Sequence, residues 1–279
     1  MKQLTNKELF KDMDQTIAKE LFEETTYPWE VLALIGDFIL KTGPELPEEE
    51  FNRIGDDVWI AKSAVIARTA EINGPAIIGA GTEVRPGAFI RGNALIGENC
   101  VVGNSTEIKN DILFNNVQVP HYNYVGDSIL GYKSHMGAGS ITSNVKSDKT
   151  NVVIKCGEQK IETGRKKIGA ILGDHVEVGC GTVLNPGSVV GANTNIYPLS
   201  MVRGYIEENS IYKKSRGDRP KTINKERISQ HEKKNDDSDA FHLRFFCVFP
   251  AAGKLPNRKS SNRNTTRNYR TRTKSSARI

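Results

Sequence analysis

An aliphatic residue recurs at every sixth position along two stretches of this 279-residue chain. The first stretch holds ten such positions from Ile54 to Ile108, and the second holds six from Leu172 to Val202. A period of six matches neither the α-helix nor the simple alternation of a β-strand. It is typical of a parallel β-helix, in which each short strand turns a corner and three hexads complete one coil. The sequence therefore predicts a mainly β fold with coils stacked about 5 Å apart.

The interior of the predicted coils follows from the same repeat. The aliphatic side chain and a small residue four positions later should both point inward, because side chains alternate along a strand. Ile66 with Ala70 and Val178 with Thr182 are two such pairs. A glycine often stands directly after the aliphatic residue, where a corner favours a left-handed backbone. Cys100 falls at an inward position and is expected to fill the core.

The repeats divide the chain into three parts. Residues 1–53 carry apolar positions at helical spacing, and we expect a helical cap over the open first coil, since repeat domains need protected ends. Residues 54–214 hold the hexapeptide repeats and should form the β-helix. The stretch from Ser143 to Lys167 interrupts the repeats as a polar, lysine-rich insertion. Residues 215–279 are largely charged and polar apart from an aromatic stretch from Phe241 to Phe249, which predicts a disordered basic tail.

Positive charge is concentrated in that tail. From Arg219 onward sixteen Lys or Arg residues stand against five Asp or Glu, so residues 1–218 carry −5 although the whole chain carries +6. Only the tail has the charge that attracts nucleic acid, so we expect no nucleic-acid partner for the folded part. The sequence holds no apolar run of membrane-spanning length and no apolar N-terminal signal segment, which predicts a cytoplasmic protein with no membrane partner.

Two cations have a spacing that matches one predicted coil. Arg91 and Lys109 are separated by three complete hexads, and each follows an inward aliphatic residue at a corner that faces solvent. Adjacent coils should place them about 5 Å apart, where they repel each other unless an anion lies between them. The spacing favours an anionic ligand, but it is equally compatible with two solvated surface charges.

A histidine follows this cationic corner. His121 belongs to a residue type that titrates near neutral pH, so it can act as a general base toward an amine or a hydroxyl group. A lone histidine is more often structural than catalytic, but this one stands among tyrosine and asparagine residues. Farther along, the stretch from Met136 to Asn144 is rich in small residues that let a ligand approach the backbone.

Three motifs in this region, taken in order, resemble the acetyltransferase half of the bifunctional UDP-N-acetylglucosamine pyrophosphorylase/glucosamine-1-phosphate N-acetyltransferase. They are GNSTEIK at 103–109, HYNYVGD at 121–127 and GAGSITSN at 137–144. The resemblance spans about residues 80–205. It implies a left-handed parallel β-helix, a homotrimer, and acetyl-CoA bound as co-substrate in a groove between neighbouring subunits.

The resemblance also implies roles for individual residues. His121 would be the general base, and Ala138 and Cys180 would lie along acetyl-CoA. The acceptor would be bound by Arg91, Lys109, Tyr124, His135 and Asn144. The chain would then transfer an acetyl group to a small-molecule acceptor, an amino-sugar phosphate or sugar nucleotide, as in UDP-N-acetylglucosamine biosynthesis, and would need no metal ion.

The chain departs from this family at several points. The family has asparagine where His135 stands and serine where Cys180 stands. The insertion after Asn144 is longer than the family's loop, so Lys149 is only a candidate for a further active-site lysine. No glycine-rich nucleotide loop precedes the repeats, and we therefore expect no pyrophosphorylase domain.

Two other functions remain open. The corner at Arg91, Gly92 and Asn93 resembles that of γ-class carbonic anhydrases, which share the hexapeptide fold and hold zinc with three histidines, two of them five residues apart. Here His121 and His135 are fourteen residues apart, which does not match that spacing. The other function is that of a non-catalytic trimeric β-helix serving as an assembly or regulatory subunit.

Overall fold

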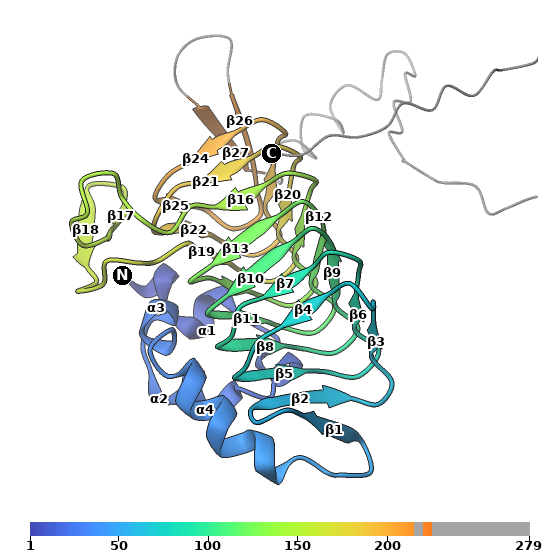
Figure 1. The fold of residues 1–279 in the computed structure, drawn as a ribbon. Helices are drawn as coiled ribbons and strands as arrows, with labels where there is room; N and C mark the ends of the chain where they lie inside the picture. Colours follow the sequence, from blue (N-terminus) through green and yellow to red (C-terminus); the bar gives the residue numbers. More distant parts are fainter. Residues whose placement is uncertain (215–219, 225–279) are drawn as a thin grey trace, which may run out of the picture. The chain divides into compact units, whose positions relative to one another are not determined.

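The computed structural model describes residues 1–214 and 220–224 and shows a parallel β-helix with short helices along one side (Figure 1). Successive strands turn through three sheets, which are named here faces A, B and C. The chain passes from A to B to C and back to A in every coil, so each face gains one strand per coil. The predicted mainly β fold of stacked hexapeptide coils is confirmed.

Nearly all strands of the coils are two to four residues long. Face A consists of β1 (Phe51–Ile54), β2 (Val58–Ala61), β5 (Ala76–Ile78), β8 (Ala94–Ile96), β11 (Asp111–Leu113), β14 (Ile129–Leu130), β19 (Ala170–Leu172), β22 (Ser188–Val190) and β25 (Tyr205–Ile206). Face B consists of β3 (Val65–Ile66), β6 (Glu83–Val84), β9 (Val101–Asn104), β12 (Gln118–His121), β15 (His135–Met136), β20 (Glu177–Val178), β23 (Asn195–Ile196), β26 (Ser210–Lys214) and β27 (Pro220–Asn224). Face C consists of β4 (Glu71–Ile72), β7 (Phe89–Ile90), β10 (Glu107–Lys109), β13 (Tyr124–Gly126), β16 (Ile141–Thr142), β21 (Val183–Leu184) and β24 (Met201–Val202).

The register between coils places the repeated aliphatic residues directly above one another. On face C, Ile72 pairs with Ile90, Ile90 pairs with Ile108, and Ile108 pairs with Val125. The first two steps span three complete hexads each, and the third step is shorter by a single residue. This shorter coil explains why the hexad pattern slips after Lys109, while the interior column continues unbroken.

The N-terminal helices lie along face A (Figure 1), so the predicted cap over the open first coil is wrong in its position. The α-helices are α1 (Asn6–Leu9), α2 (Lys19–Glu24), α3 (Pro28–Val31) and α4 (Ile35–Thr42). Three 3-10 helices accompany them: η1 (Lys2–Leu4), η2 (Met13–Gln15) and η3 (Gly43–Glu45). On face A of the first coil, β1 pairs antiparallel with β2, and Ile54 at its end remains about half exposed.

The outward residues of face A explain this position. Ile77, Leu95, Ile112, Ile129 and Ile171 are the outward-facing residues of their strands, and each is at most 2% exposed. Such a column has to be covered on both sides, and sheets covered on both sides carry continuous apolar runs in place of alternation. The helices supply the cover: α4 contacts β8, and the helices' apolar residues join the core of the coils in one cluster.

A second anchor of the helices is Phe114, at the corner between faces A and B. Glycine stands at this corner in most other coils, as at Gly97 and Gly131, whereas the Phe114 side chain is fully buried. Its ring stacks on Phe10 at 5.0 Å and meets the edge of Phe22 at 5.3 Å between ring centroids. The departure from glycine therefore marks the place where the helices dock.

The insertion forms a hairpin, and part of the predicted tail is ordered. Strands β17 (Val153–Cys156) and β18 (Gln159–Glu162) pair antiparallel in the insertion, which leaves the coils between β16 and β19. Strand β27 pairs antiparallel with β26, so the prediction of disorder is wrong for residues 220–224. The exposed backbone edge of β26 offers these residues the hydrogen bonds that disorder would leave to water. The rest of the tail lies outside the described residues.

We expect Phe114→Ala to lower the free energy of unfolding by about 3–5 kcal/mol, the usual cost of truncating a buried aromatic side chain. The helices lose their contact at one corner while the hexad core stays intact. Urea unfolding followed by circular dichroism measures the change. Phe89→Ala is the matched control: its half-buried ring lies on face C, and its loss should cost about 1 kcal/mol or less. Equal losses in the two variants would contradict the anchoring role of Phe114.

Candidate active site

Three of the predicted site residues form a column on the corner between faces B and C, which we call the B–C edge. His121, Ala138 and Cys180 stand on successive coils. The N–H of Gly139 donates to the His121 carbonyl at 3.0 Å, and the N–H of Gly181 donates to the Ala138 carbonyl at 2.9 Å. All three side chains are exposed. A long ligand lying across the coils can therefore contact all of them.

A buried asparagine fixes the position of His121 in this column. Asn123 is only 3% exposed, and its Oδ1 accepts the His121 backbone N–H at 3.1 Å. Its Nδ2 donates to the carbonyl oxygens of Gly137 at 2.9 Å and Ser140 at 3.1 Å. One side chain therefore ties the turn that follows His121 to the corner that carries Ala138. This role was missed by the sequence analysis, although Asn123 lies within the HYNYVGD motif.

Arg91 and Lys109 lie on the opposite corner of face C, between faces C and A, which we call the C–A edge. They stand on adjacent coils, as their spacing predicts, because the Arg91 N–H donates to the Ile108 carbonyl at 2.8 Å. Each cation has its own carboxylate: Arg91 Nη1 lies 2.6 Å from Glu107, and Lys109 Nζ lies 3.2 Å from Asp127. The prediction that Arg91 and Lys109 stand unpaired and repel each other is therefore wrong, because a nearby carboxylate neutralises each of them.

Asp127 is the centre of a polar network on this edge. Its side chain is 5% exposed and accepts hydrogen bonds from Lys109 Nζ, from Asn110 Nδ2 at 3.0 Å and from Asn144 Nδ2 at 2.6 Å. Asn144 Nδ2 also donates to the Tyr124 hydroxyl at 3.1 Å. The network thus joins three of the predicted acceptor residues. Asp127 itself was missed, although it is the last residue of the HYNYVGD motif.

The backbone beneath this network is held by Asp111, which is fully buried. Its carboxylate oxygens accept the N–H groups of Lys109 and Ser128, each at 2.7 Å. Burial raises the pKa of the Asp111 carboxyl well above its usual range, against the lowering effect of these two hydrogen bonds. Burial also raises the pKa of the Tyr124 hydroxyl.

His135 is separated from the other predicted acceptor residues. It begins β15 on the outer surface of face B, where it pairs in register with Gln118 and Glu177 on the neighbouring coils. Its Nδ1 lies 2.8 Å from a carboxylate oxygen of Glu177. Tyr124 lies on face C, and the Asp127 network borders the C–A edge. The structure thus brings Arg91, Lys109, Tyr124 and Asn144 to one face and leaves His135 on another.

A cavity of about 490 Å³ adjoins the network. It lies between α4 and the C–A edge, and its walls include Lys109, Asp127, Asp37 and Arg165. Arg165 comes from the insertion, and its buried Nε has no hydrogen-bond partner among the described residues. Two cations and two carboxylates around one cavity suit a ligand that offers both hydroxyl groups and a negative charge.

Within residues 1–214 and 220–224, no group of three or more His, Cys, Asp or Glu residues is arranged to hold a metal ion. In the same part of the chain, no helix is long and apolar enough to cross a membrane.

The repeat region is similar in sequence to known proteins. A family model described as the GMPPB C-terminal domain matches residues 72–207. A bifunctional sugar-1-phosphate nucleotidylyltransferase/acetyltransferase from Sulfurisphaera tokodaii is 32% identical over 107 residues, which are 38% of this chain and 27% of that protein. The bifunctional protein GlmU from Methanococcus aeolicus is 38% identical over 110 residues, which are 39% of this chain and 26% of GlmU. The resemblance indicated by the motifs is confirmed, and the chain spans about a quarter of the length of these relatives.

Solved structures with similarity to this chain include two acyltransferases. One is AntD, an N-acyltransferase from Bacillus cereus in complex with dTDP and coenzyme A, with a TM-score of 0.34 and 20% identity. The match covers 67% of this chain and 98% of AntD. The other is the perosamine N-acetyltransferase from Caulobacter crescentus in complex with CoA and GDP-perosamine, with a TM-score of 0.30, 15% identity, and coverage of 60% of this chain and 56% of that one.

The raised pKa of Asp111 predicts a pH dependence of stability. The folded chain keeps this carboxyl protonated at a pH where the unfolded chain has released the proton, so the native state binds more protons. The free energy of unfolding should then fall as pH rises from about 4, the unfolded value, through the raised pKa. Asp111→Asn removes the titration.

Urea unfolding of both chains between pH 4 and pH 8 measures this effect. We expect the difference in the free energy of unfolding to shift in favour of Asp111→Asn as pH rises. The amide cannot accept both backbone N–H groups, which adds an offset that does not depend on pH. A difference that stays constant, or that shifts toward the wild type, would show that the Asp111 carboxyl is ionised in the folded chain at these pH values.

Proposed function

We propose that this chain is an acetyl-CoA-dependent acyltransferase that acetylates an amino-sugar phosphate or a sugar nucleotide. The observation that carries the proposal is the arrangement around face C. One edge presents the exposed column of His121, Ala138 and Cys180, and the other presents the Asp127 network, with Tyr124 on the face between them. The sequence relatives whose names include an acetyltransferase activity support the same chemistry.

The reaction assigns a task to each group. The neutral amine of the acceptor attacks the thioester carbonyl, a C–N bond forms, and the C–S bond breaks as the CoA thiolate leaves. His121 removes the extra proton of the attacking nitrogen, and this proton can then pass to the thiolate. Ala138 and Gly139 offer an open backbone corner along which the pantetheine arm can lie, because a Cβ added at Gly139 would meet nothing within 4 Å.

On the acceptor side, the Asp127 network orients polar groups. Tyr124 and Asn144 already share a hydrogen bond, so a sugar hydroxyl needs little reorganisation to join them. Lys109 is about one quarter exposed and faces the cavity beside α4, where it can contact an anionic group of the acceptor without leaving Asp127. His135 lies on the outer surface of face B and would contact only a part of the acceptor that extends past the B–C edge.

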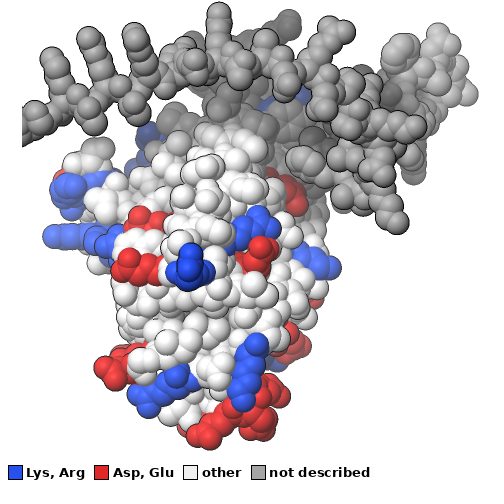
Figure 2. Space-filling model, turned by 45° about the vertical axis from the view of Figure 1, so that its right-hand side comes forward, with Lys and Arg blue, Asp and Glu red and all other residues white. Residues whose placement is uncertain are grey.

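The proposed site also needs a neighbouring copy. A column on the B–C edge of one chain gives acetyl-CoA a single wall, and ligand sites normally enclose most of the ligand surface. On the side of β3, β6, β9 and β12, Figure 2 shows a band of mixed Lys, Arg, Asp and Glu side chains and, below it, an area without charged side chains. Met201 and Leu199 on the last coils are 58% and 81% exposed. We propose a homotrimer in which a second chain closes the groove.

A non-catalytic assembly subunit is a second candidate. The pairing of Arg91 with Glu107 and of Lys109 with Asp127 favours it, because the charge of each cation is already balanced by a carboxylate in this structure. Binding of acetyl-CoA distinguishes the two functions, since an assembly subunit has no use for the donor.

We expect His121→Ala to lower kcat by about 10²–10⁴-fold, which is the usual contribution of a positioned general base. The Kd for acetyl-CoA should stay unchanged, because the column still offers Ala138 and Cys180. Release of CoA from acetyl-CoA, measured with a panel of amino sugars and their phosphates, gives kcat and KM. His175→Ala is the matched control, since that exposed imidazole lies on the far side beside Tyr132.

His135→Ala should raise KM for the acceptor more than it lowers kcat. If His121→Ala keeps the wild-type rate while His135→Ala is inactive, the general base has been assigned to the wrong histidine. A chain that binds no acetyl-CoA would remove the acyltransferase proposal altogether.

We expect multi-angle light scattering to give three times the chain mass of 30.9 kDa. Replacing the exposed Leu199 and Met201 with glutamate should lower the mass to that of one chain and abolish acetyl-CoA binding, because both effects depend on the same groove. Replacing exposed Ile17 and Leu40, which belong to the N-terminal segment along face A, should leave the mass unchanged. A wild-type chain that is monomeric at micromolar concentration would contradict the shared groove.

A further inference from the structure

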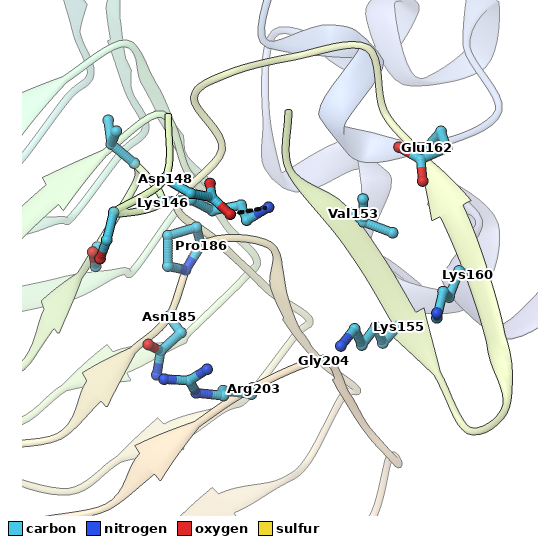
Figure 3. A pocket seen from close by; sticks show the side chains of 13 residues that line it. Lys146, Asp148, Val153, Lys155, Lys160, Glu162, Asn185, Pro186, Arg203 and Gly204 are labelled. Atoms are coloured by element: carbon cyan, nitrogen blue, oxygen red, sulfur yellow. Dashed lines mark ion pairs between the residues drawn. The ribbon is translucent and has the colours of Figure 1, made fainter. Parts of the chain in front are cut away.

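A second cavity lies under the hairpin of the insertion, outside the site described above. It has a volume of about 550 Å³ and is enclosed by β17, β18 and the C–A edge of the two following coils (Figure 3). This volume falls within the range of small-molecule sites in proteins. Its floor includes Asn185 and Arg203, and its border includes Ser143 and Val145, which stand on either side of Asn144. The cavity is therefore bordered by the two sequence neighbours of Asn144, which belongs to the Asp127 network.

The hairpin that roofs the cavity is fixed to the domain. Val152, Ile154 and Cys156 alternate along one side of it and are buried with the core of the coils. The contact is close: a Cβ added at Gly187 would come within 2.6 Å of Val152 Cγ1, and one added at Gly204 within 2.8 Å of the Lys155 carbonyl oxygen. The opposite side of the strand presents Val153 and Lys155 to the cavity, which is thus formed before any ligand arrives.

The charge in this cavity is unbalanced. Lys146 is bound to Asp148 at 3.3 Å. Lys155, Lys160 and Arg203 also line the cavity, and none of them forms an ion pair with any described residue. Glu162 is the remaining carboxylate in the lining, so the cavity has an excess of two positive charges. Figure 3 shows Lys155 extending from β17 toward Arg203, so these two cations belong to different elements and approach from different sides.

Arg203 stands on the same edge as Arg91 and Lys109. The Ser143 N–H donates to the Leu184 carbonyl at 2.8 Å, and the Asn185 N–H donates to the Val202 carbonyl at 3.0 Å, so Ser143, Asn185 and Arg203 continue the column of the C–A edge. The first two cations of this column have carboxylate partners, whereas Arg203 has none among the described residues. The unsatisfied positive charge of the edge is therefore located under the hairpin.

We propose that this cavity binds the diphosphate group of a nucleotide-linked acceptor. Three cations, two from the hairpin and one from the C–A edge of the coils, match the several negative charges of a diphosphate, and an arginine can bind two phosphate oxygens at once. The assignment of the cavity to the acceptor rests on the proposed function. The cavity borders the sequence neighbours of Asn144, whereas the column proposed for acetyl-CoA lies on the opposite edge of face C. The diphosphate of CoA is the other source of the same chemistry, and the experiment separates the two.

Calorimetric titration with inorganic pyrophosphate and with UDP tests the proposal directly. We expect both probes to bind the wild-type chain, to compete with each other, and to bind more weakly as salt rises. Arg203→Gln and Lys155→Gln should each raise Kd by about tenfold, the typical effect of losing one charge-assisted hydrogen bond. Glu162→Gln should lower Kd, because it removes a carboxylate that repels the ligand. Lys166→Gln is the matched control, since this exposed lysine of the insertion does not line the cavity.

The proposal is overturned if neither probe binds the wild-type chain, or if Lys166→Gln weakens binding as much as Arg203→Gln does. Loss of acetyl-CoA binding in Arg203→Gln, with UDP binding kept, would assign the cavity to the donor and overturn the acceptor assignment. Titration with acetyl-CoA separates this test from that of the proposed function. If the chain binds pyrophosphate and UDP but does not bind acetyl-CoA, the proposed anion site is supported and the proposed acyltransferase function is contradicted.

Discussion

The backbone hydrogen bonds between coils are the constraint on which the rest of this structure depends. Each coil must lie in register on the one before it, so a residue on one coil stands directly above its counterpart on the next. Outward side chains are thereby sorted into columns, and the character of each column decides what covers it. Face A carries an apolar outer column and is covered by helices, whereas the two edges of face C carry polar and small residues, exposed along the B–C edge and bordering two cavities along the C–A edge.

The same sorting governs electrostatics. On the C–A edge, Arg91 and Lys109 meet carboxylates supplied by Glu107 and Asp127, so stacking of like charges costs little there. Asp111, which is buried, accepts the backbone N–H groups of Lys109 and Ser128 and so ties the backbone next to this pair together. Farther along the edge no such carboxylate pairs with Arg203 in the described structure. The chain thus uses one column in two ways: two neutralised cations stand in the early coils, and Arg203, which has no carboxylate partner among the described residues, stands under the hairpin.

The hexad period was sufficient to predict the coils, the inward aliphatic residues and the stacking of Arg91 on Lys109, because each depends only on spacing. The location of the helices was predicted wrongly, although the sequence contains a signal in the three-residue apolar runs such as Ala94–Ile96 and in Phe114 at a corner where glycine is usual. The motifs led to Tyr124 and Asn144 but not to the partners Asp127 and Arg165. Contacts between distant segments, such as Arg165 with the cavity beside α4, leave no periodic trace in a sequence.

The position of the insertion has a consequence for how such a chain can change. Ile129 pairs with Ile171 across the whole insertion in the same way as Ile112 pairs with Ile129 across a single coil, so the coils close beneath the hairpin as if it were absent. Corners of this fold therefore tolerate added length without disturbing the register on either side. During evolution the hairpin over one cavity can therefore be replaced while the B–C edge keeps its geometry. Selectivity for the ligand under the hairpin can then change without changing selectivity for the ligand on the B–C edge.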